Sequence, residues 1–209
     1  MFLTKDQIHT VLNESYENAK NEILEKSKFL TKLLLDDDWS FVIKSHSLIE
    51  SLVTELIINE IDEVELKKVI ERIPLHNETV SKMEIAKIYN ILSIEERGFI
   101  ISLTEIRNKI VHKYENINFS FETHINEIID KNRRRRWREI HLWESMDKET
   151  KDEIEKNIYT NPKLAVWLAL STFIYNSLER ITITKSEKRT KEIATKNSKT
   201  IVDDWLSKE

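Results

Sequence analysis

The sequence has no cysteine and very few residues that form turns. Its 209 residues include one glycine and two prolines. Without cysteine the chain forms no disulfide, binds no metal through thiolates and has no cysteine nucleophile. A β-rich fold needs many tight turns, in which glycine and proline are prominent. We therefore predict an all-α protein with long helices, organised as a single helical domain over residues 1–209.

Long hydrophobic runs and an excess of positive charge are also missing. The longest apolar segment, residues 164–175, is interrupted by Ser171 and Thr172 and is too short to span a bilayer. The first residues lack the basic and apolar regions of a signal peptide. The net charge is −4, so any contact with nucleic acid must rest on local basic patches. We expect a cytoplasmic protein with no membrane association.

The sequence favours neither a metal nor an organic cofactor. Gly98 is the only glycine, so no glycine-rich loop is present to hold phosphates. His46 falls on a helix predicted to be buried and is read as a hydrogen-bonded core residue. The remaining histidines considered as ligands show no metal-site spacing with each other, and they are His9, His76, His124 and His141. We expect no cofactor.

Capping signals and apolar periodicity predict the order of the helices. A first helix over 4–35 opens with the capping-box pair Thr4 and Gln7 and ends at the acidic residues 36–38. A broad apolar stripe over 39–58 indicates a central, mostly buried helix. The other expected elements are helices over 62–73, 81–92, 121–132, 148–158, 164–181 and 186–206, with an extended linker over 116–121.

The most informative stretch is residues 93–114. Ser93 and Glu96 have the spacing of a capping box. Four apolar residues then recur at spacings of four, three and four, which marks one buried stripe: Phe99, Leu103, Ile106 and Ile110. Three polar residues fall outside that stripe, on the flank and far side of the same helix: Arg107, Asn108 and His112.

These three polar residues have the functional groups needed to cleave a phosphodiester without metal. The His112 imidazole titrates near neutrality and can move a proton to or from the reacting oxygens. The Arg107 guanidinium can hold phosphate oxygens and stabilise the transition state, while Asn108 orients either partner. A symmetric homodimer would supply two imidazoles to one site. The alternative is that Arg107 forms a surface ion pair, for example with Glu105 or Asp152, and that His112 merely ends the helix.

The segment Arg107-Asn-Lys-Ile-Val-His-Lys-Tyr114 resembles the R-x4-6-H motif of the HEPN superfamily, in the R-N-x-x-x-H-x-Y form of HepT-like toxins. The helices around 45–56 and 85–92 are similar to those of the mannitol-repressor-like branch. The resemblance covers residues 39–121. It implies an up-and-down helical bundle with a HEPN-like core, to which the N-terminal helix 4–35 and C-terminal helices within 122–209 are added.

The resemblance also implies an activity. Many HEPN proteins are dimeric, metal-independent endoribonucleases that leave 2′,3′-cyclic phosphate and 5′-hydroxyl ends and serve in toxin–antitoxin or antiviral-defence systems. Arg107 and His112 match the catalytic pair, and Asn108 matches the polar residue after the arginine. Tyr114 matches the tyrosine that a partner nucleotidyltransferase modifies with AMP in HepT-like toxins. The implied partners are RNA and an antitoxin or nucleotidyltransferase. The alternative is a non-catalytic, mannitol-repressor-like regulatory or binding protein.

A basic tract is the second candidate site. Arginines can contact phosphates and the tryptophan can stack on a base, as in proteins that bind single strands, so the tract predicts RNA binding. The alternative is a solvated helix face whose arginines pair with acids such as Glu139, Glu144 and Asp147. The tract consists of Arg133, Arg134, Arg135, Arg136, Trp137 and Arg138.

Overall fold

A computed structural model describes residues 3–62, 64–77, 79–112 and 114–207, except for the side chains of Val64 and Tyr114. Every regular element in this part of the chain is a helix, so the predicted all-α class is confirmed. None of the described helices is both long and apolar enough to cross a membrane.

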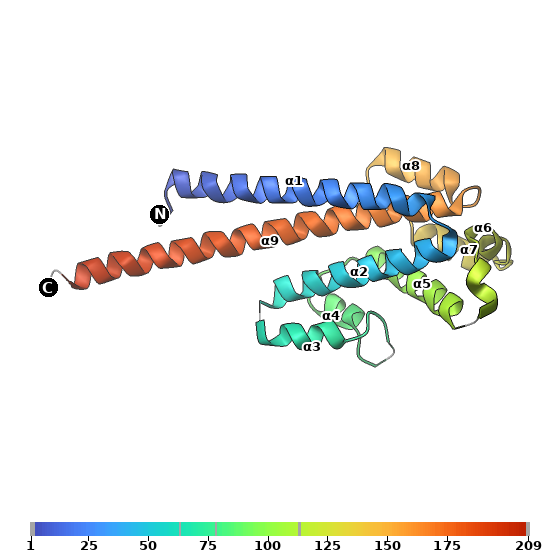
Figure 1. Ribbon diagram of the computed structural model, residues 1–209, viewed down its shortest axis with the longest axis horizontal. Coiled ribbons are helices and arrows are strands. Elements are labelled where there is room, and N and C mark those ends of the chain that lie inside the picture. The colour runs from blue at the N-terminus through green and yellow to red at the C-terminus, as the bar shows by residue number, and fades with distance from the viewer. Residues whose placement is uncertain (1–2, 63, 78, 113, 208–209) are drawn as a thin grey trace.

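The helices follow one another with short connections (Figure 1). Two short 3-10 helices, η1 and η2, interrupt the series at Val64–Leu66 and Tyr114–Asn118. The α-helices are α1 Lys5–Leu35, α2 Asp38–Ile61, α3 Lys67–Arg72, α4 Lys82–Ile88, α5 Ile94–Val111, α6 Phe121–Asn126, α7 Lys131–Glu139, α8 Lys148–Asn157 and α9 Pro162–Leu206.

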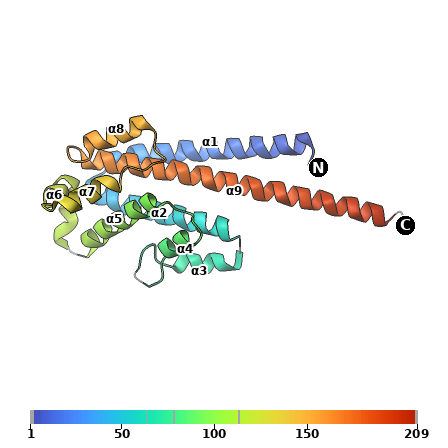
Figure 2. The same ribbon diagram turned by 180° about the vertical axis from the view of Figure 1, so that it is seen from behind.

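Helices α1 and α9 lie side by side in antiparallel directions and project beyond the remaining helices as a two-helix arm (Figures 1 and 2). Polar contacts join them along their length. The indole of Trp167 donates to the Leu30 carbonyl over 2.8 Å, and the hydroxyls of Ser27 and Tyr175 lie 2.7 Å apart. Both described ends of the chain therefore lie at the free end of this arm (Figure 1).

The core lies where α2, α5 and the first half of α9 pack together. Phe41 and Val53 of α2 and Ile100 of α5 are completely buried. From α9, Leu170 and Phe173 are also completely buried, so the apolar run predicted at 164–175 belongs to this core. Segment 122–209, expected as an addition to the bundle, thus contributes a central helix to it.

Side-chain caps start most of the helices where the sequence predicts them. Both predicted capping boxes form, at Thr4 with Gln7 and at Ser93 with Glu96. Each pair satisfies two backbone N–H groups at the open end of its helix. Asp37, within the predicted acidic break, accepts from the backbone N–H of Ser40 over 2.9 Å and begins α2.

The extended linker predicted at 116–121 is wrong, because the chain forms η2 up to Asn118 and then begins α6 at Phe121. The amide of Asn116 donates to the Lys109 carbonyl over 2.7 Å and folds the chain back onto the end of α5. The backbone N–H of Phe119 then donates to the Asn116 carbonyl over 3.0 Å, which keeps the segment in a turn.

Three predicted helices are shorter than expected. A left-handed residue lies at the start of one and just after the end of another, and a new N-cap divides the third. Asp62 adopts a left-handed conformation with φ of 58°, so the helix predicted at 62–73 begins only at Lys67 after η1. The helix predicted at 81–92 ends at Ile88, just before Asn90 with φ of 52°. The one predicted at 121–132 divides into α6 and α7, because Asp130 caps a new helix.

The separate helices predicted at 164–181 and 186–206 form one continuous helix of 45 residues, α9. Helix α9 begins at Pro162, where the Asn161 side chain accepts from the backbone N–H of Leu164 and Pro162 occupies the first turn. No glycine or proline follows Pro162, so nothing in the backbone ends the helix where its apolar residues give way to polar ones.

Candidate functional site

Helix α5 carries the sequence motif and is anchored firmly at its start. Glu96, which is 1 % exposed, accepts from the Ser93 backbone N–H over 2.8 Å. The same carboxylate accepts from Arg180 of α9 over 2.5 and 3.2 Å. Arg180 also donates to the Ile91 carbonyl over 2.9 Å. A buried bidentate ion pair thereby joins α5 to the longest helix.

The apolar stripe of α5 is buried as predicted. All four of its members are at most 4 % exposed: Phe99, Leu103, Ile106 and Ile110. They hold the helix against the core and leave the motif residues toward its outer side. The stripe therefore fixes which side chains of α5 reach solvent.

The motif residues lie at the solvent-facing end of α5. Arg107 is half-buried, whereas Asn108 and His112 are exposed. The Arg107 guanidinium donates to the Asn108 side-chain oxygen over 3.0 Å and forms no ion pair with any acid among the described residues. His112 ends the helix as its C-cap. The side chain of Tyr114, the predicted modification site, lies outside the described residues.

Arg107 and His112 diverge within one chain. They are five residues apart on a helix, which separates them by about 140° around its axis. No hydrogen bond joins them in the described structure, so a single chain does not bring the guanidinium and the imidazole together on one phosphate.

The charge of Arg107 acts on the imidazole of His46, a residue of α2. Burial lowers the pKa of His46; the charge of Glu50 opposes this shift and the charge of Arg107 adds to it. The His46 side chain is 9 % exposed, and its Nε2 has no hydrogen-bond partner within the described structure. Glu50 is held by the buried ammonium of Lys82 over 3.3 Å. His46 is thus a core residue, as predicted, but its Nε2 lacks the hydrogen bond expected there among the described residues.

The structure separates the basic tract into residues with different surroundings. Arg134 lies over the Tyr159 ring with its guanidinium carbon 4.9 Å from the ring centre, and Arg135 pairs with Glu139 over 3.5 Å. Arg138 pairs with Glu155 of α8. Arg135 and Arg138 therefore match the alternative of arginines that pair with acids on a solvated helix face, whereas Arg134 contacts an aromatic ring.

Trp137 is buried instead of standing on the surface. It is 5 % exposed, and its ring contacts His141 and His124 with centroids 4.4 and 5.8 Å apart. A ring in this position has no free face on which a base from solvent could stack. Its role in the described structure is to dock α7 against α5 and α6.

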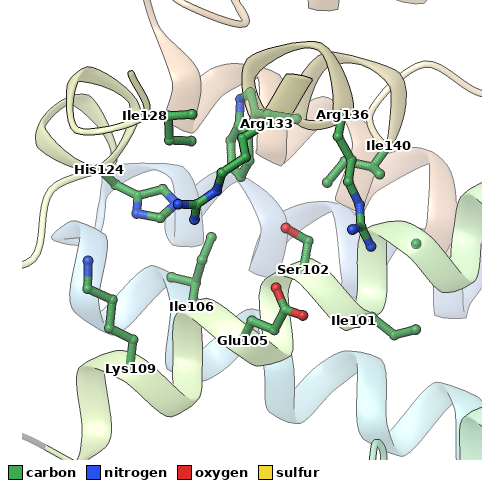
Figure 3. A pocket seen from close by; sticks show the side chains of 12 residues that line it. Ile101, Ser102, Glu105, Ile106, Lys109, His124, Ile128, Arg133, Arg136 and Ile140 are labelled. Atoms are coloured by element: carbon green, nitrogen blue, oxygen red, sulfur yellow. The ribbon is translucent and has the colours of Figure 1, made fainter. Parts of the chain in front are cut away.

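The two remaining arginines of the tract, Arg133 and Arg136, line a cavity of about 270 Å³ between α5, α6 and α7. Figure 3 shows Arg133 reaching from α7 toward His124 of α6 and Arg136 reaching toward α5, with Ser102 and Glu105 between them. Neither guanidinium forms an ion pair with a described residue. Sequence reasoning grouped all the arginines together and did not predict this cavity.

Two further basic groups border the same cavity. The Lys109 ammonium pairs with Glu127 over 3.4 Å at the surface. His124 of α6 is half-buried, and desolvation lowers its pKa, with the charges of Lys109 and Arg133 acting in the same direction against that of Glu127. The positive charges around the cavity are thus those of Arg133, Arg136 and Lys109, against the carboxylates of Glu105 in the wall and of Glu127 beside Lys109.

The cavity and Arg107 lie on opposite sides of α5. Glu105 and Lys109 line the cavity, and each is two residues from Arg107, or about 200° around the helix. Arg107 instead faces α2, where its charge affects His46. The two sequence-predicted sites are thus not parts of one surface.

Two sequence signals pointed to the cavity. Positions 133, 136, 137 and 140 share one face of a helix, and that face carries Trp137 and Ile140. Gly98, the only glycine, lies inside α5, where glycine is unfavourable. It lines the cavity, and a Cβ at this position would meet Cγ2 of Ile140 at 3.4 Å. That is an ordinary van der Waals distance, so the approach of Ile140 does not by itself require glycine at this position.

No cluster of three or more potential metal ligands from histidine, aspartate or glutamate occurs in the described ranges. Comparisons with models of known protein families, with curated proteins and with solved structures found no match to this chain.

Proposed function

We propose that this protein is a metal-independent endoribonuclease with a HEPN-like helical core, which acts as a homodimer and leaves 2′,3′-cyclic phosphate and 5′-hydroxyl ends. The observation that supports the proposal is that the Arg107 guanidinium has no carboxylate partner among the described residues. The Asn108 side-chain oxygen orients this guanidinium over 3.0 Å. A guanidinium without a carboxylate partner can hold the oxygens of a phosphodiester, and the exposed imidazole needed for proton transfer would come to it from a second chain.

The reaction needs one group to take a proton and another to give one. An imidazole removes the proton of the ribose 2′-hydroxyl, whose oxygen then attacks the phosphorus. The bond from phosphorus to the 5′-oxygen breaks, and a protonated imidazole supplies the proton to that leaving oxygen. Arg107 stabilises the additional negative charge on the phosphate oxygens during this step.

A second copy of the chain completes such a site. The motif supplies one imidazole per chain, that of His112. Arg107 and His112 also point in different directions from α5. Two α5 ends related by a twofold axis would place both His112 imidazoles and both Arg107 guanidinia around one phosphodiester. The exposed positions of Asn108 and His112 leave this end of α5 accessible to a second copy.

The biological role that we propose is that of a toxin or antiviral-defence effector restrained by an antitoxin. Tyr114 follows the motif directly in the sequence and begins η2. Its modification with AMP by a nucleotidyltransferase would add a bulky anion two residues after His112 in the sequence, and we propose that this hinders RNA binding.

The decisive experiment is cleavage of single-stranded RNA by the purified chain in EDTA, with products analysed for 2′,3′-cyclic phosphate. We expect His112→Ala and Arg107→Ala to lower the rate at least about 100-fold, the scale of general acid–base and electrostatic catalysis. His76→Ala and Arg72→Ala change the same residue types at exposed positions and serve as controls with unchanged rates.

Two outcomes would reject the nuclease. One is a rate that persists in His112→Ala, which would assign cleavage to a contaminant or another site. The other is RNA binding without cyclic phosphate products in any preparation, which would favour the non-catalytic binding protein. Sedimentation of the active species as a monomer would reject the shared site.

A further inference from the structure

The cavity between α5 and α7 presents two guanidinium groups that lack an anion. Arg133 and Arg136 are spaced by three residues and therefore project from the same side of α7. The described acids pair instead with their neighbours Arg135 and Arg138. Glu105 lies on the opposite wall without forming an ion pair to either arginine (Figure 3). The two unpaired guanidinia lie on different sides of the cavity (Figure 3), and an oxyanion between them can accept hydrogen bonds from both of these exposed side chains.

The rest of the cavity is apolar with a few polar groups. Isoleucines from α5 and α7 form much of its wall, including Ile101 and Ile140. Trp137 also lines it. Apolar walls with a few polar groups are typical of small-molecule sites.

We propose that this cavity binds a phosphate monoester with a compact body, in which Arg133 and Arg136 hold the phosphate and the apolar wall covers the attached group. A monoester carries nearly two negative charges near neutral pH, which matches two guanidinia, whereas an internal phosphodiester of RNA carries one. Glu105 and Ser102 then accept hydrogen bonds from hydroxyl groups of the ligand body.

The size of the cavity limits the ligand. Its volume of about 270 Å³ lies just below the range of sites for drug-sized molecules. One nucleotide or one sugar phosphate is therefore the largest body that it encloses. The monoester has two possible sources, a free small molecule or the terminal 5′-phosphate of a nucleic-acid strand.

This inference goes beyond the proposed nuclease, because the cavity lies on the side of α5 opposite to Arg107. Its test therefore uses probes that the nuclease does not cleave. Inorganic phosphate, uridine 5′-monophosphate and uridine are titrated into the full-length protein by calorimetry near neutral pH. Uridine has the same body without the charge.

The chain offers a matched pair of variants. Arg133→Gln with Arg136→Gln removes the two guanidinia that line the cavity. Arg134→Gln with Arg135→Gln removes the same charge from the same helix, at side chains that lie over Tyr159 and beside Glu139. All four arginines are exposed, so both double variants are expected to fold, which circular dichroism checks.

We expect uridine 5′-monophosphate to bind the wild type at least about tenfold more tightly than uridine. We expect the first double variant to lose at least about tenfold in affinity and the second to stay within about twofold; tenfold corresponds to about 1.4 kcal/mol. Equal losses in the two variants would overturn the proposal, since they indicate a general charge effect. Equal binding of uridine and its monophosphate would overturn it as well, as would no binding of either phosphate probe by the folded protein at millimolar concentration.

The source of the phosphate is distinguished with short DNA strands, which lack the 2′-hydroxyl that the proposed cleavage requires. If the ligand is a strand end, a 5′-phosphorylated hexanucleotide binds more tightly than uridine 5′-monophosphate, and its 5′-hydroxyl counterpart binds weakly. If the ligand is a free small molecule, the monophosphate binds more tightly than either strand. Either result supports the site only if the double variant Arg133→Gln with Arg136→Gln loses affinity for the same ligand. Equal binding of both strands with equal loss in both variants would reject the site.

Discussion

Replacing Arg180 by methionine tests how strongly α9 holds the start of α5. The substitution keeps most of the apolar part of the side chain and removes the guanidinium that bridges Glu96 and the Ile91 carbonyl. The Glu96 carboxylate, whose side chain is 2 % exposed, is then left with the Ser93 backbone N–H as its remaining hydrogen-bond donor among the described residues.

The expected loss follows from this burial. Removing one partner of a buried ion pair costs about 3–5 kcal/mol because the other charge remains buried without compensation. The Arg180 side chain is 36 % exposed, so water reaches the site in part and the lower end, about 3 kcal/mol, applies. For a chain of this length, that loss lowers Tm by about 6–12 °C.

The assay is denaturant unfolding followed by circular dichroism, with calorimetric Tm as a second measurement. Arg189→Met is the matched control, since it removes a guanidinium from the same helix. The side chains of Arg189 and its partner Glu14 are each 47 % exposed, so the loss should be at most about 1 kcal/mol.

A double-mutant cycle separates the pair from its surroundings. Glu96→Gln retains an acceptor for the Ser93 N–H and removes the charge. Combined with Arg180→Met, it should cost less than the sum of the two single changes, by about 1–3 kcal/mol. Additive losses, or an Arg180→Met variant no less stable than Arg189→Met, would show that the bridge does not anchor α5.

Two other consequences concern stability. Burial lowers the pKa of His141 to about 4, against a hydrogen bond with the Trp137 carbonyl that raises it, so the unfolded chain binds a proton that the folded chain does not between about pH 6.5 and 4. Stability therefore falls over that interval as pH decreases, by about 3 kcal/mol from this group. In His141→Phe, denaturant unfolding at several pH values should show a smaller fall in the free energy of unfolding between about pH 6.5 and 4. The fall that remains comes from other histidines, and a fall equal to that of the wild type would contradict the assignment to His141. Asn90 has φ of 52°, so Asn90→Gly should raise the free energy of unfolding by up to about 1 kcal/mol and Asn90→Val should lower it by about 1–2 kcal/mol. Equal stabilities of the two variants would refute backbone strain at this position.

Local signals predicted the starts of the helices well. Thr4 and Ser93 form their capping boxes with partners three residues away, so all the interacting atoms are specified within one turn. The buried stripe of α5 was also predictable, because a period of 3.6 residues identifies one helical face without knowledge of its partner. Both predictions depended on neighbours in the sequence.

The errors arose where distant or backbone contacts decide the structure. Polar and apolar residues alternate over 116–121, but the hydrogen bond from Asn116 to the Lys109 carbonyl at the end of α5 turns the chain there. The change in polarity near residue 182 suggested two helices. It marks where α9 leaves the core, and the backbone continues because hydrophobicity alone does not end a helix.

The candidate sites were predictable only in part. Arg107, Asn108 and His112 were predicted to avoid the buried stripe, and the structure leaves Arg107 half-buried and the other two exposed. The cavity depends on how α7 docks, which composition does not determine. Arg133 and Arg134 are identical in the sequence, yet one lines a cavity and the other lies over the ring of Tyr159.

The pairing of α1 with α9 has a consequence for the order of folding. Leu30 and Trp167 are joined by a hydrogen bond across 137 residues, and Ser15 and Ser186 by another across 171. Closing loops of that length is slow compared with forming a helix locally. During synthesis, α1 therefore emerges long before α9, and its apolar side stays uncovered until residues 162–206 have been made. We expect the two helices of the arm to pair later than helices that are neighbours in the sequence.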